Sequence, residues 1–112
     1  MIERYSRPVM KNIWTEETKL QKWLQVELAV CRAWSEDGAI PISDLDRIER
    51  ATVDPERVAV IQTETKHDVT AFLQAVAETL GSESRFIHLG LTSSDVIDTA
   101  LSLQMKAGVD IL

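Results

Sequence analysis

Residues 15–38 read TEETKLQKWLQVELAVCRAWSEDG, and this stretch indicates one long helix. Thr15 is a typical N-cap residue, and the two glutamates after it fall in the first turn, where negative charge is favourable. Gly38 is a natural stop signal, and Pro41 follows it. The apolar residues cover more than one stripe, so we expect this helix to be buried on at least two sides. They are Leu20, Trp23, Leu24, Val26, Leu28, Val30, Cys31 and Trp34.

Two residues of this helix are unusual for an apolar face. Glu27 lies in the middle of that face, where an unpaired carboxylate is costly. We expect Glu27 to have a basic or hydrogen-bonding partner, and we favour a structural role over a catalytic one. Cys31 is the single cysteine and can form no internal disulfide. It is predicted to be a buried free thiol in a reducing compartment.

Helical patterns continue through the rest of the chain, no convincing alternating strand occurs, and the predicted fold class is all-α. Caps, prolines and apolar spacing locate the helix starts. The predicted starts are Pro8, Ser43 as the cap of residues 44–51, Asp54-Pro55, Asp68 in a helix that ends at Gly81, and Thr92.

Size and charge limit the classes of function. A chain of 112 residues suggests one domain, and 45% hydrophobic with 27% charged residues is an ordinary globular composition. The net charge of −6 argues against nucleic acid or an anionic membrane as the main partner. No apolar run reaches membrane-spanning length and no signal peptide is evident, so we expect a cytoplasmic protein.

Three polar clusters are candidates for chemistry. Arg4-Tyr5-Ser6-Arg7 offers guanidinium groups suited to a phosphate or carboxylate, beside an aromatic face. Lys66-His67-Asp68 lies at a junction of two predicted helices, where a histidine can be oriented and tuned. The third cluster joins His88 to residues 92–95, Thr-Ser-Ser-Asp, at the start of the last predicted helix.

The third cluster combines helix capping with a capacity to bind anions. Thr92 and Asp95 fit a variant of the capping box, and the helix N-terminus with its hydroxyls can hold an anionic group. A cap without any ligand is the simpler interpretation of this motif alone. His67 and His88 lack the spacing of a zinc site, and no phosphate-binding or dinucleotide glycine loop occurs. We therefore expect neither a metal nor a cofactor.

Three motifs together resemble the N-terminal region of the bacterial adenylosuccinate lyases, a family of the fumarase/aspartase superfamily. They are RYSRP at residues 4–8, TKHDV at 65–69 and HLGLTSSDVIDTA at 88–100. The resemblance covers residues 1–112 in order. It implies an N-terminal helical domain over residues 1–91 and, over residues 92–112, the start of the first long helix of a central bundle. It also implies a homotetramer whose sites combine segments from three subunits.

The resemblance implies a β-elimination that releases fumarate from adenylosuccinate, giving AMP, and from succinylaminoimidazole carboxamide ribotide. It implies a nucleotide substrate and a site with no cofactor. The resemblance assigns Arg4 and Tyr5 to the nucleotide, with Arg4 at the phosphate, and Thr92 and Ser93 to a succinyl carboxylate. It places Lys66, His67 and Asp68 in the lining of the site, with His67 assisting acid–base work or orientation. His88 is a weaker candidate, either at the site edge or supporting the turn at Gly90.

The same resemblance implies that the main general acid and base lie outside residues 1–112. Gly108–Leu112 end the sequence without a helix cap, so we expect an N-terminal piece that has no activity alone. Two alternatives stay open. One is another lyase or cycloisomerase of the superfamily, against which Arg4 and Tyr5 argue because they suit a nucleotide. The other is a non-catalytic helical interaction module that docks through its last helix.

Overall fold

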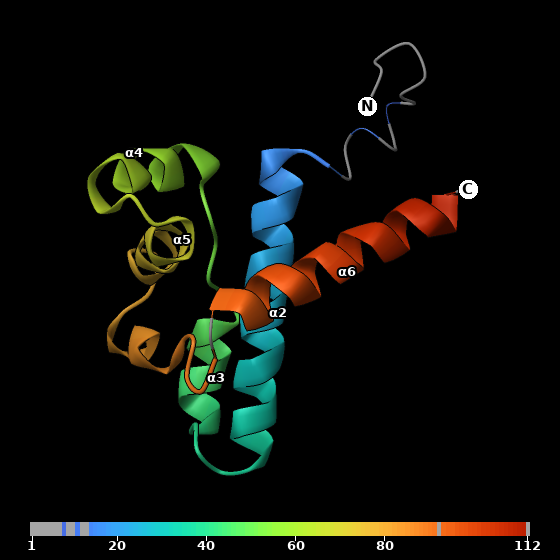
Figure 1. Cartoon of the computed structure of the whole chain (residues 1–112). Helices are drawn as coiled ribbons and strands as arrows, with labels where there is room; N and C mark the ends of the chain where they lie inside the picture. Colours follow the sequence, from blue (N-terminus) through green and yellow to red (C-terminus); the bar gives the residue numbers. More distant parts are fainter. Residues whose placement is uncertain (1–7, 9–10, 12–13, 92, 112) are drawn as a thin grey trace.

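The structure, a computed structural model, describes residues 8, 11, 14–91 and 93–111, with the backbone alone at 93 and 94. Every regular element in these ranges is helical, which confirms the all-α prediction (Figure 1). The elements are α2 (Glu16–Glu36), α3 (Ile42–Ile48), α4 (Pro55–Thr65), α5 (Asp68–Ala77), the 3-10 helix η2 (Ser82–Phe86) and α6 (Ser93–Ile111). The helix predicted after Pro8 lies mostly outside the described residues.

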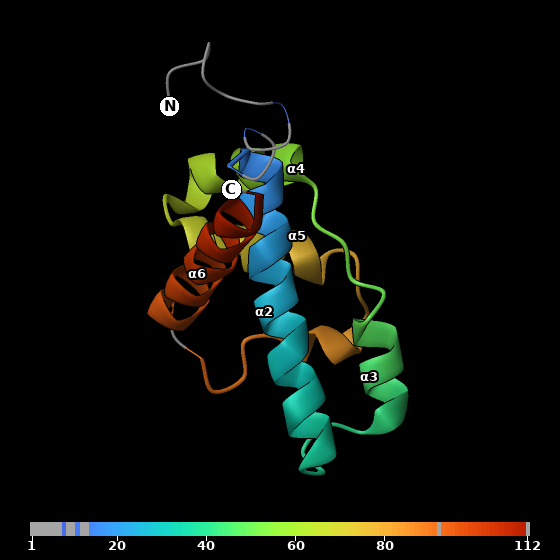
Figure 2. The ribbon, with the colours of Figure 1, turned by 90° about the vertical axis from the view of Figure 1, so that its right-hand side faces the viewer.

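The long helix α2 is the axis around which the other elements are arranged. It begins as predicted, because the hydroxyl of Thr15 accepts the amide of Thr18 at 3.2 Å. It ends at Glu36, and Gly38 turns the chain with a φ of 86°. Helix α6 packs across α2, α3 lies against the C-terminal part of α2, and α4 packs on α5 (Figures 1 and 2).

Two groups of buried side chains hold the helices together. The larger joins α2, α4, α5 and α6, and in it Trp23 meets Phe72 edge to face, with centroids 5.5 Å apart at 87°. The smaller group joins α2 to α3 through Cys31, Ile40 and Ile48. Cys31 is 1% exposed, which confirms the predicted buried thiol, and burial raises its pKa to about 11.

Two predicted helices have wrong boundaries: the helix predicted over residues 44–51 is Ile42–Ile48, and the helix predicted to end at Gly81 is Asp68–Ala77. Ser43 does not cap residues 44–51, because the carbonyl of Pro41 accepts the amides of residues 44 and 45 and the helix already begins at Ile42. Helix α5 ends at Ala77, before the predicted stop at Gly81. There the hydroxyl of Thr79 donates to the carbonyl of Val76 at 2.7 Å and competes with a further helical turn.

Candidate functional site

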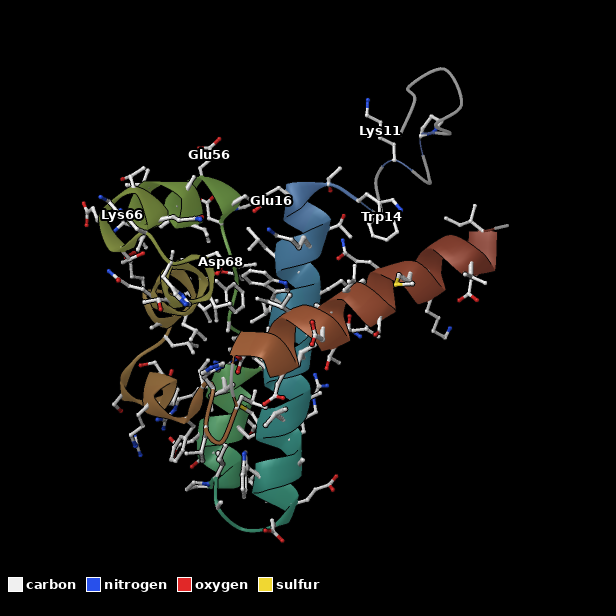
Figure 3. All side chains as sticks on the ribbon, viewed as in Figure 1. Lys11, Trp14, Glu16, Glu56, Lys66 and Asp68 are labelled. Atoms are coloured by element: carbon white, nitrogen blue, oxygen red, sulfur yellow. The ribbon has the colours of Figure 1, made fainter. Side chains whose placement is uncertain are left out.

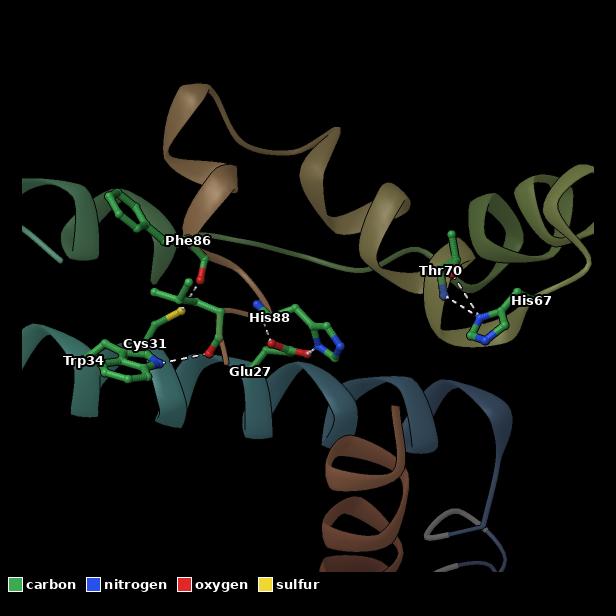
Figure 4. A network of polar contacts seen from close by, with 8 residues as sticks. Glu27, Cys31, Trp34, His67, Thr70, Phe86 and His88 are labelled. Atoms are coloured by element: carbon green, nitrogen blue, oxygen red, sulfur yellow. Dashed lines mark hydrogen bonds and ion pairs between the residues drawn. The ribbon is translucent and has the colours of Figure 1, made fainter. Parts of the chain in front are cut away.

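A carboxylate from α2 and a histidine from the segment before α6 form the central polar contact. Glu27 is fully buried, and its two oxygens meet the same residue. The backbone amide of His88 donates to Oε2 at 2.9 Å, and its ring Nδ1 lies 2.6 Å from Oε1 (Figure 4). The expectation that Glu27 has a partner is confirmed, and the partner lies 61 residues away in the chain.

Burial and pairing act on Glu27 in opposite directions. Removal from water raises the pKa of the Glu27 carboxyl above its usual value, and the contacts with His88 lower it. Removing one partner of such a contact leaves an unsatisfied polar group in the interior. The pair therefore fixes the segment around His88 against α2.

The turn that leads into α6 is also fastened to α2 by a tryptophan. The indole Nε1 of Trp34 donates to the carbonyl of Leu89 at 3.0 Å, and the amide of Leu91 donates to the carbonyl of His88. Gly90 has a φ of 75°, and a Cβ placed on it would lie 3.1 Å from Cζ2 of Trp34. Both the backbone conformation and the close approach call for glycine at this position.

The helix mouth predicted to bind an anion is described only in part. Ser93 is the first residue of α6, as expected for a motif at a helix start. Thr92, its capping contact with Asp95 and the side chain of Ser93 lie outside the described residues. Their assignment to a succinyl carboxylate stays a prediction.

A groove lies beside this turn, and no motif in the sequence predicted it. Its volume is about 880 Å³, and α2, the turn at 89–91 and α6 form its walls. The lining is mostly apolar, with Val26, Val30 and Trp34 from α2, Leu89 and Leu91 from the turn, and Leu103 from α6. The second apolar stripe on the long helix was the signal that could have located it.

The Lys66-His67-Asp68 cluster forms the joint between α4 and α5. Lys66 caps the end of α4 with a φ of 55° and is exposed. His67 is the N-cap of α5, because its Nδ1 accepts the amide of Thr70 at 3.2 Å. Asp68 is half-buried, and its carboxylate accepts the amide of Val69 at 2.7 Å. Figure 3 labels Lys66 and Asp68 at this joint.

The cap fixes which nitrogen of His67 faces outward as a donor. Since Nδ1 accepts the Thr70 amide, the proton of a neutral ring lies on Nε2. The exposed edge of this imidazole is therefore a hydrogen-bond donor. Capping was not part of the sequence prediction for His67, although the position one residue before a helix was a signal for it.

Within one chain the predicted site residues form separate groups. His88 and Gly90 lie against α2, at Glu27 and Trp34. His67 and Thr70 lie apart from His88 (Figure 4). Arg4 and Tyr5 lie outside the described residues. No helix in the described part of the chain combines the length and the apolar character needed to cross a membrane.

The helical arrangement is that of the fumarase/aspartase-type lyases. A fumarate lyase from Mesorhizobium sp. BNC1 superposes with a TM-score of 0.79 at 20% identity, over 95% of this chain and 27% of that one. The 3-carboxy-cis,cis-muconate lactonizing enzyme from Pseudomonas putida gives 0.86 at 29% identity, over 96% of this chain and 26% of that one. The first comparison shows the fold alone.

Sequence comparison identifies the family. The family model described as "Lyase" matches residues 3–112, and the chain belongs to this lyase family. It is 52% identical to an adenylosuccinate lyase of Bacillus subtilis (strain 168) and 55% identical to one of Synechocystis sp. (strain ATCC 27184 / PCC 6803 / Kazusa), in both cases over all of this chain. The chain spans about a quarter (26%) of the length of these relatives.

Proposed function

We propose that this chain is part of an enzyme that eliminates fumarate from adenylosuccinate, giving AMP, and from succinylaminoimidazole carboxamide ribotide. The observation that carries the proposal is the identity of 52 and 55%, over the whole chain, to two adenylosuccinate lyases. The 29% identity to a muconate lactonizing enzyme makes a cycloisomerase the weaker candidate. A non-catalytic interaction module has no comparable support.

Anti β-elimination needs a base for the succinyl proton, an acid for the departing nitrogen, and donors for the charge that develops on the carboxylate. We assign donor roles to this chain and the principal acid and base to later parts of the protein. Arg4 and Tyr5 hold the nucleotide, with Arg4 at the phosphate. Thr92 and Ser93 hold a succinyl carboxylate at the start of α6.

The Lys66-His67-Asp68 joint is assigned to the same substrate. His67 acts as a supporting acid or orienting group, and its outward Nε2 proton suits this role. Lys66, which is exposed, supplies positive charge, and Asp68 holds the start of α5. His88 borders the site and supports the turn at Gly90.

We further propose a homotetramer in the cytoplasm, with residues 1–91 as the N-terminal domain and 92–112 as the start of a bundle helix. Two observations support an assembly. The site groups lie apart in one chain (Figure 4), so a shared site needs segments of other copies. Helix α6 also exposes an apolar row, with Leu101, Met105 and Val109 at 45, 55 and 66%, that suits packing against bundle helices.

The test is fumarate release from adenylosuccinate, followed by ultraviolet absorbance. The full-length protein is expected to turn over, and the 112-residue chain alone is expected to show no activity above background. Absence of turnover by a folded full-length protein would overturn the proposed function. Activity of the short chain alone would overturn the assignment of the main acid and base to later segments.

The role of His67 is tested by two substitutions that separate capping from chemistry. Asparagine is a good N-cap residue and cannot supply the acid, whereas alanine supplies neither function. In the full-length enzyme, His67→Asn should keep the stability of the parent, and His67→Ala should lose about 1 kcal/mol. Both should lose about 100-fold or more in kcat. If His67→Asn keeps the kcat of the parent, His67 is only a helix cap and its assignment as a supporting acid or orienting group is refuted.

A further inference from the structure

One buried carboxylate holds both the main chain and the ring of His88. Oε2 of Glu27 accepts the backbone amide at 2.9 Å, and Oε1 lies 2.6 Å from Nδ1. The Glu27 side chain has no surface exposed to solvent, whereas 21% of the His88 side-chain surface is exposed. A single residue of α2 therefore sets both the position of His88 and the direction in which its ring points (Figure 4).

The hydrogen-bond pattern also determines where the ring proton lies. One carboxylate oxygen already accepts an N–H, and a second N–H donor is the natural partner of the other. An ionised carboxylate can only accept hydrogen bonds, so the 2.6 Å contact between Oε1 and Nδ1 calls for the proton on the ring nitrogen. With the proton on Nδ1, the nitrogen that does not face Glu27 is Nε2.

We propose that Glu27 is a positioning residue that holds His88 in the tautomer with its proton on Nδ1, so that Nε2 is a hydrogen-bond acceptor for the substrate. His67 has the opposite arrangement, because its Nδ1 is an acceptor and its Nε2 a donor. The two histidines of the chain are thus fixed as an acceptor and a donor. The effect on turnover rests on the proposed function, whereas the tautomer itself does not.

Glu27→Gln has nearly the same shape and predicts a specific change. The amide oxygen of glutamine can accept the His88 backbone N–H only if its NH₂ group faces Nδ1. The reverse orientation would place a donor against the backbone donor. The ring must then accept at Nδ1 and carry its proton on Nε2, so the exposed nitrogen changes from acceptor to donor. When a catalytic histidine is held in the wrong tautomer, kcat can fall by several orders of magnitude.

The tautomer can be measured directly by solid-state ¹⁵N NMR on the full-length protein labelled with ¹⁵N-histidine. Paired labelling across the Ile87–His88 peptide bond assigns the resonances without any substitution. At a pH where the ring is neutral, we expect a protonated Nδ1 and an unprotonated Nε2. Glu27→Gln should exchange the two signals. A parent protein with its proton on Nε2 would overturn the proposal, whether or not the variant folds.

Kinetics test the link to the substrate, with Glu83→Gln as the matched control. Glu83 is also a buried carboxylate (6% exposed) that accepts a backbone amide, that of Gly81 at 2.9 Å, and the charged groups that act on it are Arg47 and Arg85. Glu27→Gln should lower kcat about 100-fold with little change in KM, and Glu83→Gln should leave kcat unchanged. Equal kcat in the two variants would overturn the proposal. An inactive parent with the expected ¹⁵N signals would instead refute the proposed function.

Discussion

Gly90→Ala tests whether the turn before α6 is fixed by contact with α2. Gly90 and Gly38 both have a positive φ of similar size, 75° and 86°. Their surroundings differ, because a Cβ at Gly38 meets nothing within 4 Å and one at Gly90 lies 3.1 Å from Cζ2 of Trp34. Gly38→Ala is therefore a control for the conformational cost alone.

The expected difference can be worked out from these contacts. A left-handed alanine costs about 1–2 kcal/mol, and reduced freedom of the unfolded chain offsets about 0.4–1 kcal/mol of it. Gly38→Ala should thus lose about 1 kcal/mol. At Gly90 the indole of Trp34 cannot move freely, since its Nε1 donates to Leu89. Overpacking against the indole therefore lowers the free energy of unfolding of Gly90→Ala by about a further 1–3 kcal/mol.

Urea unfolding followed by circular dichroism measures this difference. With a slope of about 1–3 kcal/mol per molar urea, an extra 2 kcal/mol shifts the midpoint by about 1 M. In a Trp34→Ala background the obstacle is gone, and Gly90→Ala should cost no more than Gly38→Ala. Equal midpoints of the two glycine variants in the parent background would refute the reasoning.

Three other outcomes are expected from the same structure. Phe72→Ala should lower the free energy of unfolding by about 3–5 kcal/mol in urea denaturation, because the ring is fully buried against Trp23; a loss below 1 kcal/mol would contradict this packing. Cys31 should react slowly with a thiol reagent at pH 8, since a pKa of about 11 leaves roughly a thousandth of the thiol ionised. Its rate should rise with pH and increase sharply in urea, and rapid labelling of the folded protein would be inconsistent with its burial. Ser93→Ala in the full-length enzyme should raise KM more than it lowers kcat in the fumarate assay, and an unchanged KM would exclude Ser93 from substrate binding.

Local signals predicted the fold well, because they act over a few residues. Thr15 and Gly38 bound the long helix, and Asp54 caps α4 through its contact with the amide of Glu56. Ser43 failed as a cap because Pro41, two residues earlier, already had the conformation that starts a helix. Residue preferences for helix starts could not distinguish a helix capped by Pro41 from one capped by Ser43.

The candidate site was predictable as residue types and not as contacts. The sequence indicated that Glu27 needs a partner, yet several groups could have met it, and the partner is 61 residues away. His67 was interpreted as a site residue, and its capping of α5 depends on a rotamer that spacing does not determine. The groove needs the angle between α2 and α6, which no local pattern contains.

Two residues other than glycine have a positive φ in the described part of the chain, and both belong to the predicted site clusters. They are Lys66 at 55° and His88 at 68°. Glycine would adopt either conformation without steric cost, so backbone conformation alone gives no reason for a lysine or a histidine there. Side chains that are kept despite an unfavourable backbone conformation are characteristic of functional sites. At position 66, selection for stability alone would favour glycine over the lysine of the proposed site. At position 88, glycine would relieve the backbone and leave the buried carboxylate of Glu27 without its ring partner, so the histidine serves both the fold and the proposed site.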